Sequence, residues 1–496
     1  MNRGIFARMS TEIAVEGNRA KAPDVWGHPR SLWMLLIVTA GFNYALYGFR
    51  AYLAPYIAER FFGGLGAVAA QRQADLLTSG FLALVYATPI VGGYVADKLL
   101  GELRSVALSF WLGTLSLLLM ALPTLSGFET GLALFALAIG LNIPLTVLIG
   151  RNYADSDPRR EGAYTLYYLA INFGAFVAPF ICADFVAGRF GYRWGFIASA
   201  AGMALAAVVF QARQDRLRPV VPRTGHEHGG KAALWVIASI AVLTYPTVLL
   251  LSKPRILGAA MYVLMGLLVL YFVVSCMRRG QRVQTQRYIA LLLLFVALVM
   301  YWTFSFESVT SLNFFARDHV RAPFNYTLFQ AANPLYILAF APLLALLWPW
   351  LGRRGQDPST PRKFGIGLLC IALGYGLMVL AVRHASGGKV AWEALAGYYL
   401  LATLGELALM PIGYALVGLL AAPEESSLAM GGWFFGLALA YQLAGWIATL
   451  TASGAAYAGI ATYSQVYGEL FLVGGLVGLV YLLGAPLISK LMHGIH

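Results

Sequence analysis

Three ionisable residues stand inside long apolar stretches of this 496-residue chain, and they are the side chains best placed to do chemistry. Arg50 and Glu307 lie in apolar runs that begin near residues 31 and 288, and Glu406 lies in a later run. A guanidinium does not lose its proton in hydrocarbon. Arg50 must therefore face a protein interior or a water-filled cavity and meet an acid, an anion or carbonyl groups there.

Arg50 and Glu307 are predicted to lie at the same depth. Each follows the start of its run by 19 residues, which is about 28 Å along a helix. A buried charge alone costs several kcal/mol, and pairing recovers much of that cost. We therefore expect an ion pair near the outer leaflet. Protonation of Glu307 would break this pair and release a gate; the alternative is a static structural ion pair.

Glu406 comes 14 residues into a predicted span that begins near residue 392, which places it near mid-membrane. A lone carboxylate at that depth is by default a functional-site hypothesis. The alternative is a protonated acid that is hydrogen-bonded to a carbonyl.

The composition indicates the elements that must hold these residues. The chain is 59% hydrophobic and only 11% charged, with a mean hydropathy of +0.71, whereas soluble proteins carry about 25% charged residues. Apolar runs of about 20 residues recur from residue 31 to the C-terminus, each long enough to cross a bilayer. The sequence therefore predicts an all-α polytopic membrane protein.

The net charge of +13 sets topology and does not indicate nucleic-acid binding. The basic residues cluster in the loops around 151–160, 213–231, 278–287 and 353–363. All four loops fall on one side if the N-terminus is inside. We expect both termini to be cytoplasmic, with no removable signal peptide, because residues 1–30 lack an apolar core.

Fourteen spans are predicted in four segments of the chain. A cytoplasmic N-terminal segment (1–30) precedes a six-helix bundle (31–212), a linker with two extra peripheral helices (213–287) and a second six-helix bundle (288–496). Two six-helix bundles that cross the bilayer in the same sense are typical of a two-fold-related transporter.

The loop after the second span carries a motif with Gly93, Asp97, Gly101 and Arg104. It resembles the Gly/Asp/Gly/Arg loop of the major facilitator superfamily, with one residue more after the aspartate. The glycines permit a tight turn, and the aspartate can cap a helix or pair with basic residues. A solvated turn is the alternative.

Further motifs strongly resemble the proton-dependent oligopeptide transporter family over nearly the whole chain. They are the runs Tyr164–Phe176, Asn333–Ile337, Pro358–Phe364, Gly405–Pro411 and Met430–Phe435. The resemblance implies a bacterial importer of di- and tripeptides, driven by protons in the cytoplasmic membrane. The extra helix pair after the sixth span is the bacterial type.

The resemblance also implies roles for individual residues. Arg50 and Glu307 would form the outer gate, and Glu406 would bind the amino terminus of the peptide. The implied substrate-binding set is Arg50, Tyr47, Tyr86, Asn172, Asn333, Glu406 and Trp433. From residue type alone, the two asparagines could instead make ordinary interhelical hydrogen bonds, and the aromatic residues could serve packing.

The first span departs from the family pattern. Where the family has an E-x-x-E-R run, this chain has Thr39, Phe42 and Asn43, and Asn142 occupies the fourth-span lysine position. Two acids and two cations are thus missing. An alternative is a transporter of the same fold for nitrate, an amino-acid conjugate or a peptide-like antibiotic, acting as an importer or as an exporter.

A receptor that retains the fold without transport is a third hypothesis, which the three retained ionisable residues oppose. The sequence contains no Walker loop, zinc-ligand cluster, haem site or serine triad. We therefore predict no enzyme activity, no metal and no cofactor, and expect the transporter to work as a monomer.

Overall fold

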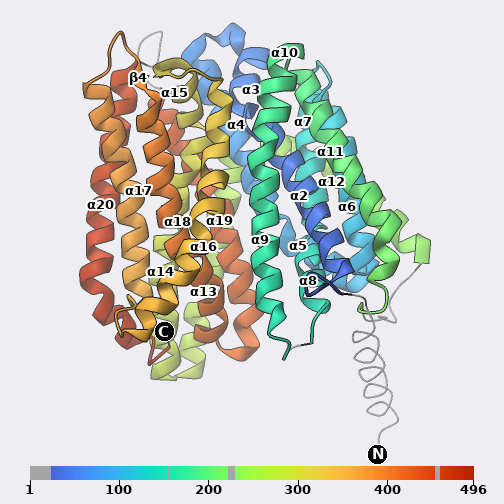
Figure 1. Ribbon diagram of the computed structural model, residues 1–496, viewed down its shortest axis with the longest axis vertical. Helices are drawn as coiled ribbons and strands as arrows, with labels where there is room; N and C mark the ends of the chain where they lie inside the picture. Colours follow the sequence, from blue (N-terminus) through green and yellow to red (C-terminus); the bar gives the residue numbers. More distant parts are fainter. Residues whose placement is uncertain (1–23, 155, 222–228, 453–458, 496) are drawn as a thin grey trace, which may run out of the picture. The chain divides into compact units, whose positions relative to one another are not determined.

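The computed structural model describes residues 24–154, 156–221, 229–452 and 459–495 (Figure 1), with the backbone alone at 24, 229–230, 410–415 and 427. Most of the predicted N-terminal segment and part of the predicted linker lie outside these ranges.

The fold is built from long apolar helices. Within the described residues, thirteen helices are long and apolar enough to cross a membrane. One further long helix, α18 (Trp392–Leu420), occupies the remaining predicted span and contains residues 410–415, which are described by their backbone alone. The predicted all-α polytopic class is confirmed.

The chain forms two compact units, which we call the first unit (residues 1–49 and 88–248) and the second unit (residues 50–87 and 249–496). The predicted division into two bundles with a linker between them is a separate statement about spans and stays a prediction.

The first unit contains a short antiparallel strand pair and the helices that follow it. Its elements are β1 (Asp24–Val25), β2 (His28–Pro29), α2 (Arg30–Arg50), α5 (Pro89–Val95), the π-helix η2 (Ala96–Leu100), α6 (Glu102–Met120), α7 (Leu125–Gly140), α8 (Pro144–Arg151), α9 (Arg159–Ala178), the π-helix η3 (Pro179–Ala187), α10 (Gly188–Phe190), α11 (Tyr192–Arg213), η4 (Gln214–Arg216) and α12 (Gly229–Leu251).

The second unit takes in the ends of α2 and α12 and all remaining helices, and α17 and α20 run side by side within it (Figure 1). Its elements are α3 (Leu53–Phe61), η1 (Gly63–Leu65), α4 (Ala67–Ala87), α13 (Pro254–Arg279), α14 (Arg282–Phe306), η5 (Glu307–Val309), α15 (Ser311–His319), β3 (Val320–Arg321), η6 (Tyr326–Ala331), α16 (Ala332–Arg353), α17 (Thr360–Arg383), β4 (Val390–Ala391), α18, η7 (Pro423–Glu425), α19 (Ser426–Thr451) and α20 (Ile460–Leu491). Strands β3 and β4 pair in parallel, with Val320 opposite Val390.

The extra pair α12 and α13 exposes most of its apolar surface. Only 28% of the α12 span window and 22% of the α13 window are buried. Apolar helix surface that protein does not cover faces lipid in a membrane protein. The peripheral placement of the pair stays a prediction.

Among the interrupted spans, two break beside the predicted site residues Arg50 and Glu307. The first ends at Arg50 and resumes as α3, and the ninth ends at Phe306 and resumes as α15. A break frees backbone carbonyls, which must find donors when no water is present. Asn313 meets this need at the first break, because its Nδ2 donates to the Ala51 carbonyl oxygen over 3.1 Å.

Candidate functional site

Arg50 is the last residue of α2, and its side chain is buried within the second unit. It is 8% exposed, and its guanidinium carbon lies 6.0 Å from the centre of the Tyr441 ring. Tyr399 lies within electrostatic reach of this charge. A cation at the carboxyl end of a helix is stabilised by the helix dipole. The helix break therefore holds the Arg50 charge among aromatic side chains.

Glu307 lies at the second helix break and is fully buried. Its Oε2 accepts hydrogen bonds from the hydroxyls of Ser311 and Thr310, the latter at 3.4 Å. Its Oε1 is buried and has no hydrogen-bond partner among the described residues. The described contacts of Glu307 are thus with hydroxyls, and its pairing with Arg50 stays a prediction.

Asp75 on α4 is a second fully buried acid, which the sequence analysis missed. Both of its carboxyl oxygens are buried without a hydrogen-bond partner in the part of the chain that the structure describes. Its carboxyl interacts electrostatically with that of Glu307. Asp75 lies in the ninth position of α4, which begins at Ala67. The available signal was the four-residue spacing of Gln71, Asp75 and Ser79, which places polar groups on one helix face.

Asn333 and Glu406, which were predicted separately, touch one another. The Nδ2 atom of Asn333 donates to Glu406 Oε2 over 2.8 Å and approaches Thr403 Oγ1 at 3.0 Å. Glu406 is 7% exposed. The carboxylate is therefore held in a fixed orientation by an amide from α16 and keeps the capacity to accept further hydrogen bonds.

Hydrogen bonds also connect the Glu307 break with η6 and α18. Gln330 donates from Nε2 to the Ser308 carbonyl oxygen at 2.5 Å and lies 3.4 Å from the Tyr399 hydroxyl. Thr403 donates to the Tyr399 carbonyl oxygen over 2.7 Å. These bonds tie η6 to the helix break and to α18, the helix that also carries Glu406.

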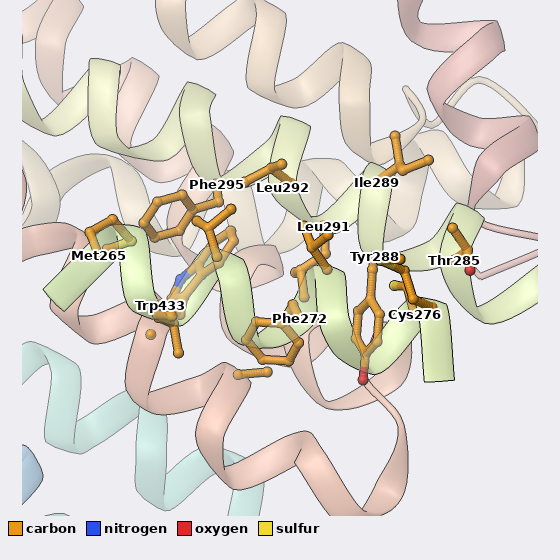
Figure 2. Close-up of a pocket in the computed structure, with 16 residues that line it drawn as sticks. Met265, Phe272, Cys276, Thr285, Tyr288, Ile289, Leu291, Leu292, Phe295 and Trp433 are labelled. Carbon is orange, nitrogen blue, oxygen red and sulfur yellow. The ribbon is translucent and has the colours of Figure 1, made fainter. Parts of the chain in front are cut away.

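The predicted aromatic residues fall in two different places. Tyr86 packs near the break, with its ring centre 5.3 Å from Tyr441 and 6.3 Å from Phe306. Trp433 instead lines an apolar cavity of about 320 Å³ among α13, α14 and α19, where it faces Phe295 (Figure 2). Trp433 is thus surrounded by apolar side chains, and its role in substrate binding stays a prediction.

Tyr47 and Asn172 belong to the first unit. Asn172 is buried on α9, and its Nδ2 donates to the Tyr168 carbonyl oxygen over 2.9 Å. This is a bond back to its own helix, which leaves the side-chain oxygen as an acceptor. Tyr47 is half-buried on α2, one turn before Arg50.

The loop motif forms a close turn between α5 and α6. Gly101 has φ +78°, which favours glycine, while Asp97 and Arg104 are exposed. Gly93 has room for a side chain, but a Cβ on Gly92 would lie 2.0 Å from the Gly140 carbonyl oxygen. The tight packing of α5 on α7 therefore rests on the first glycine of the pair.

A buried acid in this region had not been singled out from the sequence. Glu102, at the start of α6, accepts from Arg151 Nε over 2.8 Å, and both of its oxygens are engaged. Such bidentate pairing fixes the orientation of both side chains. It joins α6 to the end of α8 within the first unit.

Glu425 ties the second unit together beyond the end of α18. It accepts hydrogen bonds from Ser275 at 2.5 Å and from Tyr288, and Arg279 lies 3.5 Å away. Burial raises the pKa of Glu425, but these hydrogen bonds and the arginine charge outweigh burial and bring the pKa below its ordinary value. Since Ser275 and Arg279 are on α13, this acid fastens the extra helix to α14 and η7.

A polytopic helical protein with acids buried inside its spans is typical of a secondary transporter. Within the described residues, no group of three His, Cys, Asp or Glu side chains could hold a metal ion.

Comparisons with known proteins define the family. The model of the POT family matches residues 105–466, and the chain belongs to this family. The resemblance drawn from the motifs is confirmed.

Relatives and solved structures of this family cover nearly the whole chain. It is 30% identical over 470 residues to Peptide transporter YePEPT of Yersinia enterocolitica subsp. palearctica serotype O:3 (strain YE-P4), covering 88% of this chain and 90% of the relative. It is 28% identical over 490 residues to Dipeptide and tripeptide permease B of Edwardsiella piscicida, covering 95% and 98%. A crystal structure of a mutant of peptide transporter POT in complex with alafosfalin has a TM-score of 0.83 at 28% identity, covering 97% and 99%. The fold is that of the major facilitator superfamily.

Proposed function

We propose that this protein is a proton-coupled symporter that imports di- and tripeptides by alternating access. The relatives that carry the proposal are named as peptide transporters or as dipeptide and tripeptide permeases. The single structural observation that supports it is the placement of opposite charges within the second unit, with Arg50 near Tyr399 and Tyr441 and Glu406 farther along α18.

The length of α18 between Tyr399, which lies near Arg50, and Glu406 suits a short peptide. Tyr399 and Glu406 are seven residues apart on one face of α18, which is about 10 Å at 1.5 Å per residue. A fully extended tripeptide spans about 10 Å, and a dipeptide spans about 7 Å. Its carboxylate would bind Arg50 and its ammonium would bind Glu406, with the amide of Asn333 available to a peptide carbonyl.

The remaining assignments belong to the same proposal. Tyr47, Tyr86, Asn172 and Trp433 complete the substrate-binding set, and Glu307 with Arg50 serves as the gate. The positive loops support cytoplasmic termini in a bacterial cytoplasmic membrane. The transporter acts as a monomer without cofactor or metal, and it is not an enzyme.

A second candidate is a transporter of the same fold with another cargo. Asn43, at the position of a family arginine, donates from Nδ2 to the Thr39 carbonyl oxygen over 2.9 Å. This position carries no charge and its amide is satisfied within its own helix. A nitrate, conjugate or peptide-like antibiotic is the alternative cargo.

Uptake of labelled dialanine into proteoliposomes, with and without an inward proton gradient, tests the proposal. One proton moving down 100 mV supplies about 2.3 kcal/mol, enough for tens-fold accumulation. Gradient-driven accumulation that Glu307→Gln loses, while peptide exchange survives, would support a symporter coupled through Glu307. If the wild type moves no dialanine, the peptide assignment is wrong, and competition with nitrate or conjugates identifies the cargo.

A further inference from the structure

Asp75 is a fully buried acid that lies outside the proposed substrate-binding and gate residues. It is completely buried, and neither carboxyl oxygen has a hydrogen-bond partner within the described ranges. No arginine, lysine or histidine in those ranges forms an ion pair with it. A carboxylate without a partner in such surroundings costs several kcal/mol, and binding a proton removes that cost.

The packing of α4 fixes where Asp75 points. One turn before it, Gln71 donates to the Tyr463 hydroxyl over 2.9 Å. Near the other end of α4, the Tyr86 ring packs on Phe306, the residue directly before Glu307. Tyr463 in turn packs on Phe315 of α15, with ring centres 5.3 Å apart. The face of α4 that carries Asp75 is therefore pinned at both ends to the segments that flank Glu307.

A third contact brings the polar face of α4 against α19. A Cβ on Gly445 would lie 1.7 Å from Ser79 Oγ and 3.5 Å from the Asp75 carbonyl oxygen. Because the two helices approach this closely, there is little room for water beside Asp75. Its described electrostatic neighbours include the Glu307 carboxyl.

We propose that Asp75 is a proton-binding residue of the transport cycle and acts together with Glu307; we call these two acids the carboxyl pair. Both carboxyls are fully buried in the second unit, where two charges of the same sign are costly, so we expect the pair to retain at least one proton. In each cycle the pair takes up one proton from the outer solution and releases one to the inner solution, and no other reactant is consumed. This inference deepens the proposed function and rests on it.

Among the ionisable groups near the pair, the two acids are the groups suited to bind and release the transported proton. Phenol groups come from α17, α18 and α20, and the nearest charged side chains of α15 pair with one another or with α3. These neighbours are Tyr375, Tyr398, Tyr463, Tyr467, Arg317, Asp318, His319 and Glu59, with Arg50 beside Tyr399 and Tyr441.

The pair also accounts for a departure in the first span. The family acids correspond to Thr39 and Phe42 in this chain, so α2 offers no carboxyl for protons. An acid on the second span next to Glu307 supplies a carboxyl at another place in the fold.

Proteoliposomes with Asp75→Asn test the proposal. We expect gradient-driven dialanine accumulation to fall on the order of tenfold, because one proton down about 100 mV supports tens-fold accumulation. Exchange of labelled for unlabelled dialanine, which needs no net proton movement, should survive. Asp75→Glu should restore part of the accumulation. Glu129→Gln, a half-buried acid of the first unit, is the matched control. Accumulation by Asp75→Asn at the wild-type level would overturn the proposal.

A spectroscopic measurement separates this proposal from the transport assignment. Infrared spectra of the purified protein should contain the C=O band of a protonated carboxyl that is lost in Asp75→Asn and kept in Glu129→Gln. Glu307→Gln should shift its titration. If dialanine is not transported but this band behaves as described, the cargo is wrong and the carboxyl pair stands. If the band is unchanged in Asp75→Asn, the pair is wrong whatever the cargo. Asp75→Glu, which should keep a shifted band, gives the same decision if Asp75→Asn does not fold.

Discussion

Replacement of Glu406 by glutamine tests whether its carboxylate binds the amino terminus of the substrate. Glu406 is 7% exposed, and its Oε2 accepts the Asn333 amide hydrogen over 2.8 Å. A glutamine has the same shape, and its oxygen can accept the same hydrogen bond. Glu406→Gln therefore removes the charge while the contact with Asn333 and the packing of α18 are kept.

The size of the effect follows from the bond that is lost. A hydrogen bond to a charged group contributes about 1.5–3 kcal/mol. The affinity for dialanine should therefore fall roughly 10- to 150-fold. The maximal rate of exchange should change less, because Glu307 and Asp75 are untouched.

The assay compares dialanine with N-acetyl-dialanine as competitors of labelled peptide in an exchange experiment. Acetylation removes the ammonium from the substrate, so the wild type should discriminate strongly and Glu406→Gln should discriminate weakly. The four affinities form a double-mutant cycle whose coupling energy reports the contact itself. Glu393→Gln, an exposed acid in the first turn of the same helix, should behave as wild type.

Two outcomes would refute this reasoning. Equal weakening of both peptides in Glu406→Gln would give no coupling and would assign Glu406 a structural role. Unchanged affinity for dialanine would mean that the ammonium binds elsewhere.

Two further predictions concern stability. In Gly445→Ala the new Cβ would lie 1.7 Å from Ser79 Oγ, and overpacking of this kind costs about 1–3 kcal/mol. The thermal midpoint in detergent should fall, and Ser79→Gly in the same chain should recover part of it. Glu425 has a lowered pKa. Its contribution to folding stability is therefore present above the ordinary carboxyl range and is lost as pH falls through its folded pKa. Below pH 4.5, the ordinary value, the wild type should lose stability more steeply than Glu425→Gln.

Controls accompany both measurements. Gly431→Ala, where no atom lies within 4 Å of the added Cβ, should leave the thermal midpoint unchanged. Glu424→Gln is the matched acid beside Glu425, and its side chain is 69% exposed. A steep acid loss that persists in Glu425→Gln would show that another group carries the pH dependence.

The sequence predicted the class of fold well, because span length and apolar content are direct requirements of the bilayer. It predicted the positions of the helix breaks less well. The segment around Arg50 is largely apolar, and its one local signal is Pro55, which has no N–H to donate to the Ala51 carbonyl four residues earlier. The Ala51 carbonyl is satisfied by Asn313, which lies far away in sequence. Such a break depends on a tertiary donor, which a hydropathy pattern does not contain.

Asp75 escaped prediction for a related reason. Gln71, Arg72, Gln73 and Asp75 lower the mean hydropathy, so the apolar run seems to start after them. In the structure Arg72 and Gln73 are exposed, whereas Gln71 and Asp75 are buried on the opposite face of the same helix. Hydropathy averages over all faces of a helix, whereas burial selects one face. An acid at a buried face position is therefore hidden by its exposed neighbours.

Glu307 and Asp75 lie in different backbone surroundings, and this difference bears on proton coupling. Glu307 stands where α14 breaks, and its carboxyl contacts Thr310 and Ser311 just beyond the break. Changing its charge alters hydrogen bonds at a point where the backbone is already irregular. Asp75 stands in the middle of a regular helix that is pinned at both ends. A proton that moves between the two carboxyls therefore transfers charge between a rigid helix and a break, which is the arrangement that a proton-driven conformational change requires.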